Sequence, residues 1–163
     1  MTSEGIGLAG FNELSPAAAE EALLACCAAP TWARVVAGTR PYPTVAALLA
    51  TADAALAGLG ADDLDAALAA HPRIGGPTDS PASAREQAGV GEAERAALAA
   101  GNRAYERKFG HRYLVCAAGR GGAELLAVLT ARLDHDPATE RQVMRTELAK
   151  INRLRLARLV ARS

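Results

Sequence analysis

An amphipathic helical pattern runs through residues 136–161, whose sequence is DPATERQVMRTELAKINRLRLARLVA. Asp136 followed by Pro137 is typical of an N-cap and a first helical position, because the carboxylate can accept from the free first-turn amides and proline is tolerated at N1. The apolar residues that then recur at helical spacing are Met144, Leu148, Ile151 and Leu159. Basic residues dominate the rest of this stretch, with Glu140 and Glu147 between them, and we expect these charged side chains to form a solvated face.

Helical patterns with similar start and stop signals cover most of the remaining chain. The predicted helices lie at residues 16–29, 31–37, 44–59, 62–71, 92–108 and 123–133, with a short one opening at residue 83. Their expected starting or capping residues include Ser15, Thr44, Asp62 and Ser83. Residues 113–118 alone have the composition of a buried extended segment. We therefore predict an all-α fold with one domain over residues 1–163, a bundle of about seven to nine helices and a flexible stretch at residues 1–9.

The composition restricts the class of protein. The chain has 163 residues with 18 basic and 18 acidic side chains, so its formal net charge is zero. This length is sufficient for one hydrophobic core, and the charge balance does not favour nucleic acid or an anionic membrane as a partner. No apolar run approaches the roughly 20 residues of a membrane span, and residues 1–10 lack the pattern of a signal peptide. We expect a cytoplasmic protein that binds neither nucleic acid nor membrane.

The cysteines predict neither a disulfide framework nor a metal site. Their number is odd, and Cys26 and Cys27 are adjacent, with Cys116 far along the chain. Such a pattern is typical of reduced cysteines, and the spacing to the three histidines is not that of zinc ligands. We expect Cys26 and Cys27 to pack as small apolar residues.

The first candidate for chemistry is His71, in the stretch HPRIG at residues 71–75. His71 ends the apolar face of a predicted helix, which Pro72 prevents from continuing normally. A helix C-terminus favours the imidazolium whereas burial opposes it, so such a site can place the titration of histidine near neutral pH. His71 is therefore a candidate acid–base residue, and the alternative is a histidine that only caps helix carbonyls.

A second polar group lies in the stretch SAREQAG at residues 83–89. Ser83 and Glu86 have the spacing of a capping box, in which each side chain accepts from the backbone amide of the other residue. Glu86 and Gln87 in a first helical turn can also present an acceptor and a donor to a ligand, and the helix dipole would keep Glu86 ionised. Both the capping role and the ligand-binding role are open.

The third candidate is Arg155. At ~100° per residue, Arg155 projects in the middle of the apolar stripe of the last helix, whereas Arg153 points almost the opposite way, to solvent. An arginine on a core-facing side is costly unless an anion or acceptors satisfy its donors. A buried ion pair with an Asp or Glu would do so, and so would a substrate carboxylate bound by two hydrogen bonds.

The predicted extended segment 113–118 offers a different kind of recognition. A lone extended segment in a helical protein has no sheet partner, so its backbone groups could bind a heterocycle. His111 and His135 are expected at the surface. The glycine-rich turn at residues 119–122 is too short and unpatterned for a phosphate loop.

Taken in order along the chain, these motifs resemble the 2-oxo-4-hydroxy-4-carboxy-5-ureidoimidazoline (OHCU) decarboxylases, which act in urate breakdown. The likeness covers nearly the whole chain, and the ordered set is specific although each piece alone is weak. The matching pieces are FNEL at 11–14, Cys26-Cys27 with Trp32, Arg40-Pro41, HPRIG at 71–75, SAREQAG at 83–89, KFG at 108–110, LVCA at 114–117, Lys150-Ile151 and LRL at 154–156.

The resemblance implies an all-helical homodimer that converts OHCU to (S)-allantoin with neither metal nor organic cofactor. His71 matches the catalytic histidine of the family, and Glu86 would hold it. The positions that match the substrate site are Pro72, Ser83, Glu86, Gln87 and Arg155, together with main-chain groups near Val115 and Ala117. The competing hypothesis is a non-catalytic helical binding or scaffold module, which an arginine on the apolar stripe disfavours.

Overall fold

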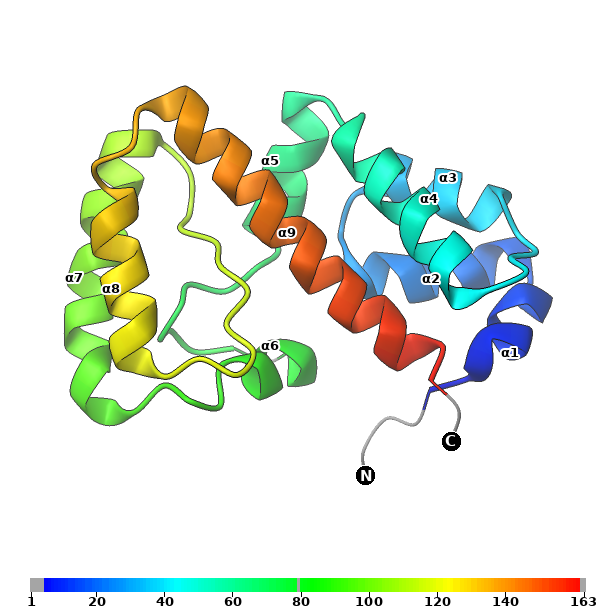
Figure 1. Ribbon diagram of the computed structural model, residues 1–163, viewed down its shortest axis with the longest axis horizontal. Coiled ribbons are helices and arrows are strands. Elements are labelled where there is room, and N and C mark those ends of the chain that lie inside the picture. Colours follow the sequence, from blue (N-terminus) through cyan, green and yellow to red (C-terminus); the bar gives the residue numbers. More distant parts are fainter. Residues whose placement is uncertain (1–4, 79, 162–163) are drawn as a thin grey trace. The chain divides into compact units, whose positions relative to one another are not determined.

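The computed structural model describes residues 5–78 and 80–161, within which nine helices lie (Figure 1). The helices are α1 (Gly7–Glu13), α2 (Pro16–Cys26), α3 (Pro30–Gly38), α4 (Val45–Ala57), α5 (Ala61–Ala69), α6 (Pro81–Glu86), α7 (Glu92–Phe109), α8 (Gly122–Arg132) and α9 (Pro137–Leu159). The predicted all-α class is confirmed, since no strand occurs among these described residues. Residues 1–4 of the stretch expected to be flexible lie outside the described residues, and residues 7–9 form the first turn of α1.

Local capping determines where several helices begin. Ser15, Thr44 and Asp136 each accept a hydrogen bond from the amide three residues later, at 3.1, 3.1 and 2.8 Å, which confirms three predicted starts. Asp62 is not the cap that we expected. Helix α5 begins at Ala61, and Asp62 lies in its first turn, where a carboxylate still favours the positive end of the helix dipole.

The chain forms two compact units, and the first comprises Met1–Ala67 together with Ala149–Ser163. In this unit α2 packs on α3, and α3 packs on α4. The indole of Trp32 is fully buried, and its Nε1 donates to the carbonyl of Ala52 at 3.0 Å. A hydrogen bond at the buried indole nitrogen lets this large side chain sit in the core without leaving an unsatisfied donor.

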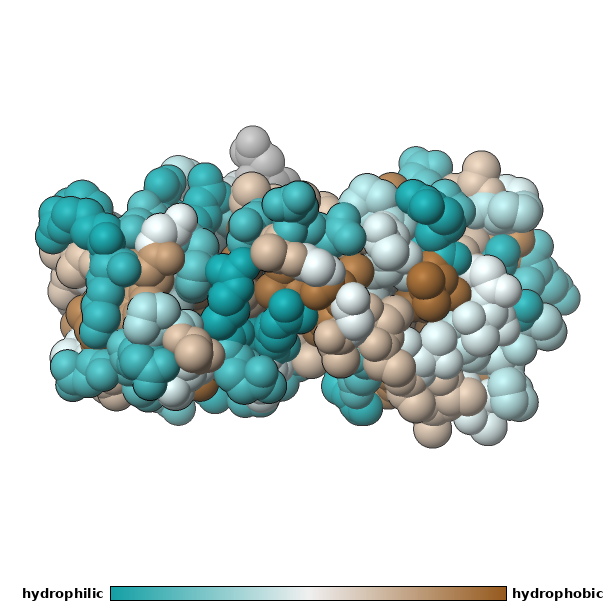
Figure 2. Space-filling model, turned by 90° about the horizontal axis from the view of Figure 1, so that it is seen from above, coloured by the Kyte–Doolittle hydropathy of each residue, from teal (hydrophilic) through white to brown (hydrophobic). Residues whose placement is uncertain are grey.

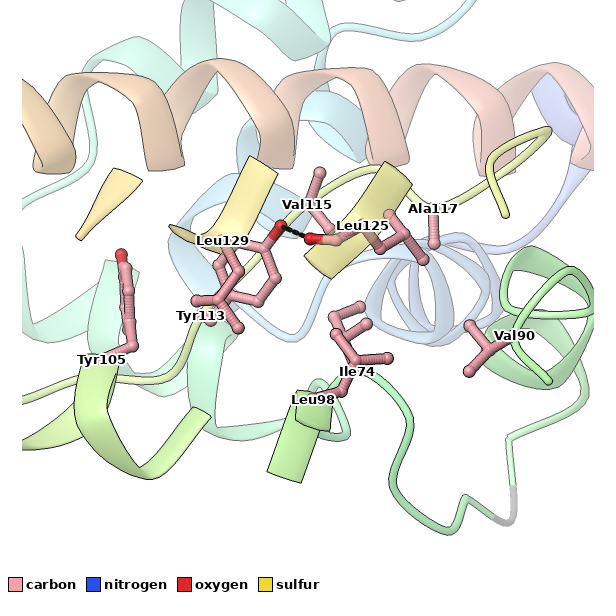
Figure 3. Close-up of a cluster of buried hydrophobic side chains, with 9 residues drawn as sticks. All are labelled: Ile74, Val90, Leu98, Tyr105, Tyr113, Val115, Ala117, Leu125 and Leu129. Atoms are coloured by element: carbon pink, nitrogen blue, oxygen red, sulfur yellow. Dashed lines mark hydrogen bonds between the residues drawn. The ribbon is translucent and has the colours of Figure 1, made fainter. Parts of the chain in front are cut away.

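The second unit, Leu68–Leu148, contains α6, α7, α8 and the first part of α9. Helices α7 and α8 lie side by side (Figure 1), and Gly101 permits their close approach, because a Cβ there would lie 2.5 Å from Cδ2 of Leu129. The buried cluster in this unit (Figure 3) consists of Ile74, Val90, Leu98, Tyr105, Tyr113, Val115, Ala117, Leu125 and Leu129. This core therefore takes side chains from the loop after α5 and from the segment before α8 as well as from helices.

The described surface mixes polar and apolar side chains. Figure 2 shows a face on which hydrophobic residues occur in small groups among hydrophilic ones. The large hydrophobic residues that are most exposed in the first unit are Ile6, Leu24, Val35 and Val45, each on a different helix or its cap. Within the described residues no single helix is long and apolar enough to cross a membrane. Helices α4 and α5 together have sufficient length and apolar character, but the pair is bent by 113°.

Candidate active site

His71 lies just beyond the end of α5 in the second unit. The helix ends at Ala69, two residues earlier than the predicted range, and the amide of His71 still donates to the carbonyl of Leu68 at 3.1 Å. Pro72 follows, and proline cannot continue a helix. His71 is 7% exposed, so its imidazole is placed in a largely buried environment at a helix C-terminus.

Arg112 fixes the backbone around His71. Its Nη1 donates to the carbonyl of His71 at 2.7 Å and to that of Ala69 at 3.3 Å. These carbonyls belong to the last turn of α5 and its exit, where acceptors have no partner within the helix. The arginine therefore caps the helix from a segment 41 residues away in the sequence, and no local pattern predicted this role.

The loop after Pro72 is held by side chains from α7 and from the end of α6. Asn102 donates to the carbonyl of Ile74 at 2.9 Å, and Oε1 of Gln87 accepts from the amide of Gly75 at 2.8 Å. Gly75 has φ +81°, a conformation that glycine adopts without strain. Gln87 therefore uses its carbonyl oxygen inside the protein, while its amide nitrogen has no partner among the described residues and can donate to a ligand.

Ser83 and Glu86 do not form the predicted capping box. Helix α6 begins at Pro81, and the N-cap is Ser80, whose hydroxyl accepts from the amide of Ser83 at 3.2 Å. The Ser80-Pro81 pair sets the start because proline suits N1 and serine suits the N-cap. Glu86 is consequently the last residue of α6 and does not lie in a first helical turn, where the sequence pattern placed it. Ser83 and Glu86 lie one turn apart and are 4% and 7% exposed, so both occupy the buried face of α6.

The predicted extended segment is neither helix nor strand at residues 112–117. The side chains of Val115 and Ala117 lie in the core (Figure 3), so only their main chains are available for binding. Arg132 Nη1 donates to the carbonyl of Leu114 at 2.6 Å, and the amide of Cys116 donates to Oε1 of Glu147 at 3.2 Å. Between these two anchors, the amide and carbonyl of Val115 have no hydrogen-bond partner in the part of the chain that the structure describes.

Direct contacts bring the end of α6 beside the start of α8. The amide of Gly122 donates to the carbonyl of Gly89 at 3.2 Å, and a Cβ at Gly89 would lie 2.5 Å from the carbonyl oxygen of Arg120.

The Cys116 thiol lies near carboxylates of two other helices. Burial raises the pKa of this thiol, and the nearby carboxylates of Glu147 on α9 and Glu86 on α6 raise it further. The segments that carry His71, Ser83, Glu86, Gln87, Val115 and Ala117 are thus joined to one another within the second unit.

Arg155 lies in the first unit, on the last turns of α9. It is half-buried, and its Nη1 donates to the carbonyl of Cys26 at 3.1 Å. Arg153 is exposed and pairs with Asp53 at 2.7 Å from Nε to Oδ2. The helical phase predicted from the sequence is therefore confirmed for this pair of arginines, while binding of substrate by Arg155 remains a prediction.

The three cysteines form no disulfide, and burial raises the pKa of each thiol. Burial raises the pKa of Cys26 to about 11 even though the Arg155 guanidinium lowers it, and burial also raises the pKa of Cys27. The pKa of the Cys116 thiol is raised as well, so we expect none of the three cysteines to act as a thiolate nucleophile near neutral pH.

Sequence reasoning missed two buried carboxylates of α9. Glu140 is fully buried and Glu147 is 5% exposed, whereas both were expected on a solvated face. Glu140 accepts from Tyr105 at 2.5 Å and from Arg132 Nε at 2.7 Å. Helical geometry could have predicted their burial. At ~100° per residue, Glu140 and Glu147 lie only about 40° and 60° around the helix from Met144, which belongs to the apolar stripe.

The two histidines expected at the surface are half-buried instead. The ring of His135 contacts Oε2 of Glu140 at 3.0 Å, and the ring of His111 packs edge-on against that of Tyr105, with 5.5 Å between ring centroids. Each histidine therefore takes part in the packing around the Tyr105 and Glu140 side chains.

Two further features of the described residues concern binding. No three His, Cys, Asp or Glu side chains come together there as a metal-binding cluster. A cavity of about 410 Å³ lies in the second unit between the loop after Pro72 and α7, with Arg73, Asn102, Arg103 and Glu106 as its polar lining. None of the predicted site residues lines this cavity.

The sequence model of the OHCU decarboxylase family matches residues 12–157, and the chain belongs to this family. It is 31% identical over 146 residues to the uric acid degradation bifunctional protein TTL of Arabidopsis thaliana, an alignment covering 82% of this chain and 45% of that protein. The chain therefore spans less than half the length of this curated relative.

Solved structures of the same fold include two with names from this chemistry. One is the crystal structure of an OHCU decarboxylase in the presence of (S)-allantoin, with 29% identity, a TM-score of 0.77, and coverage of 86% of this chain and 97% of that one. The other is an (S)-allantoin synthase, with 20% identity, a TM-score of 0.75, and coverage of 95% of this chain and 54% of that one. The second likeness concerns the fold alone.

Proposed function

We propose that this protein decarboxylates OHCU to (S)-allantoin in urate catabolism. The family to which the chain belongs supports this reaction, as does the related OHCU decarboxylase structure determined in the presence of (S)-allantoin. The observation that carries the proposal is the joining of three segments in the second unit. Arg112 holds the carbonyl of His71, and Gln87 holds the loop that follows Pro72. The carbonyl of Gly89 accepts from the amide of Gly122, which joins the end of α6 to the segment that contains Val115.

The substrate itself supplies the electron sink. One ring carbon carries both a carboxylate and a hydroxyl, and the adjacent carbon carries the ureido group and is doubly bonded to a ring nitrogen. When the bond to the carboxylate breaks, its electron pair forms a carbon–carbon double bond, the C=N electrons move to nitrogen, and that nitrogen takes a proton. The resulting enol loses its hydroxyl proton as the carbonyl forms, and a proton added to one face of the neighbouring carbon gives the (S) product.

The side chains have distinct roles in this scheme. His71 exchanges the proton at the hydroxyl or the ring nitrogen and is held by Glu86, so both are proposed as catalytic residues. The groups that would hold substrate are Ser83, the Gln87 amide, the Arg155 guanidinium, and the main chains of Val115 and Ala117, with Pro72 shaping the site. Holding the carboxylate, ring and ureido group keeps the breaking bond aligned with the C=N π system.

We also propose a cofactor-independent homodimer that acts in the cytoplasm, with its two compact units folding as one domain. Cofactor independence follows from the electron sink in the substrate, and the dimer rests on the family resemblance. The buried free thiols of Cys26 and Cys27 suit a reducing compartment. Helix α9 passes from one unit into the other, which favours a single cooperative unfolding transition. Light scattering and urea unfolding test the dimer and the single domain.

The activity is tested with freshly generated products of urate oxidation and hydrolysis. The uncatalysed reaction is slow and gives racemic allantoin, so added protein should produce a circular dichroism signal of (S)-allantoin faster than buffer does. Production of racemic allantoin at the buffer rate would reject the decarboxylase assignment and favour a non-catalytic module.

A further inference from the structure

The Glu147 carboxylate is buried beside residues 114–117, which belong to neither a helix nor a strand. It lies on α9 and is 5% exposed, and its Oε1 accepts from the amide of Cys116 at 3.2 Å. The same oxygen lies 3.9 Å from Nη1 of Arg120, whose side chain is 28% exposed. Because a buried carboxylate needs hydrogen bonds and an opposite charge to offset its desolvation, these contacts explain how Glu147 is kept in this position.

The contact with Cys116 completes a set of anchors along residues 114–117. The carbonyl of Leu114 is held by Arg132 at 2.6 Å, and the carbonyl of Ala117 accepts from the amide of Arg120 at 3.0 Å. Glu147 supplies the anchor between them, on the amide of Cys116. Without it, the peptide between Val115 and Cys116 would have no hydrogen bond of its own among the described residues, and only the anchors on either side would fix it.

Val115 is the residue whose orientation these anchors determine. Val115 is 2% exposed, and its side chain packs in the core (Figure 3). Its amide and carbonyl have no hydrogen-bond partner among the described residues. Buried backbone groups normally have partners. A donor and an acceptor on one residue match the N–H and C=O edge of a ureide ring.

We propose that Glu147 is a positioning residue, which holds the Cys116 amide so that the main chain of Val115 meets the ring of the substrate in one orientation. The inference rests on the proposed function. It concerns the orientation of the ring, and therefore the affinity for substrate and the face that receives the proton. It does not concern the proton transfers assigned to His71.

Two variants separate the geometry of Glu147 from its charge. Glu147→Gln keeps the length and the accepting oxygen, and it should retain the KM and the enantiomeric excess of the wild-type protein. Glu147→Asp keeps the charge but is one methylene shorter, so the hydrogen bond to Cys116 is lost, and we expect KM to rise about tenfold and the enantiomeric excess of (S)-allantoin to fall. Glu124→Asp is the matched control, because Glu124 is an exposed carboxylate that also lies 3.9 Å from Arg120.

Stereochemistry distinguishes positioning from a merely structural role once the racemic product of the uncatalysed reaction is subtracted. Partial unfolding lowers the amount of active enzyme, but it changes neither KM nor the enantiomeric ratio of the allantoin that the enzyme itself forms. Thermal melts of all three variants identify any loss of folded protein. The inference is overturned if Glu147→Asp keeps wild-type KM and enantiomeric excess, or if Glu147→Gln is impaired as much as Glu147→Asp, while the wild-type protein is active. An inactive wild-type protein overturns the proposed function and this inference with it.

Discussion

Removal of the Glu140 carboxylate is expected to destabilise the second unit strongly. Oε1 of Glu140 accepts from the hydroxyl of Tyr105 at 2.5 Å and from Nε of Arg132 at 2.7 Å, and Oε2 contacts the ring of His135 at 3.0 Å. The side chains of Glu140 and Arg132 are 0% and 4% exposed. In Glu140→Ala the guanidinium would remain buried without its counter-charge.

The expected magnitude follows from that burial. Removing one partner of a buried ion pair costs about 3–5 kcal/mol, which is a large part of the roughly 5–15 kcal/mol that stabilises a typical domain. Urea unfolding at pH 7, followed by far-ultraviolet circular dichroism, measures the loss. Glu92→Ala is the matched control, because the Glu92 side chain in its pair with Arg95 is 92% exposed, and the variant should lose less than about 1 kcal/mol. A loss below about 1 kcal/mol in Glu140→Ala would mean that Arg132 finds another acceptor and that the ion pair does not stabilise the second unit strongly.

The same network sets the response to acid. Burial raises the pKa of Glu140, but hydrogen bonds from Arg132, Tyr105 and His135 outweigh it and hold the pKa below its ordinary value. A depressed carboxyl pKa stabilises the fold above the unfolded pKa of about 4.3, and that contribution is lost as the pH falls through the folded pKa. Between pH 6 and pH 3 the wild-type protein should therefore lose more stability than Glu140→Gln, which has no carboxyl to protonate. Parallel losses would contradict this assignment.

Three further predictions concern the reaction. Arg155→Ala removes a charge-assisted contact worth about 1.5–3 kcal/mol and should lower kcat/KM roughly tenfold or more, and Arg155→Lys should restore kcat/KM only in part. Arg153→Ala should match wild type because its pair with Asp53 is exposed. Equal effects at both arginines would mean that the substrate arginine is misassigned. His71→Ala should lower kcat by roughly 10²-fold or more in a protein that still folds, and a fully active variant would remove His71 from the mechanism. Dialysis against EDTA should leave the rate and the enantiomeric excess unchanged, whereas a loss restored by a divalent ion would defeat cofactor independence.

Local patterns predicted most helix positions because the signals are local. Ser15-Pro16 and Asp136-Pro137 each begin a helix as expected, since capping and the fixed φ of proline act within one turn. The error at α6 arose because two start signals overlap in one stretch. The spacing of Ser83 and Glu86 suggested a capping box, whereas Ser80-Pro81 begins the helix three residues earlier.

The supports of the candidate site were not predictable in the same way. Arg112 caps α5 from 41 residues away, and Glu147 reaches Cys116 across 31 residues, so both contacts depend on how the chain folds back. The burial of Glu140 and Glu147 was within reach of helical geometry. Charge alone placed them at the surface, but their angular position near Met144 placed them on the apolar stripe.

The proposed enzyme accelerates the loss of the carboxylate from OHCU and controls the face of protonation. The most direct measurement is ¹³C NMR of the reaction with OHCU labelled at the carboxylate, read together with the chirality of the allantoin formed. We expect the wild-type protein to release labelled carbon dioxide faster than buffer and to leave one enantiomer, and we expect the rate of His71→Ala to be lower by roughly 10²-fold or more. Release of carbon dioxide at the buffer rate with racemic product, in the presence of folded wild-type protein, would mean that the chain is not an OHCU decarboxylase.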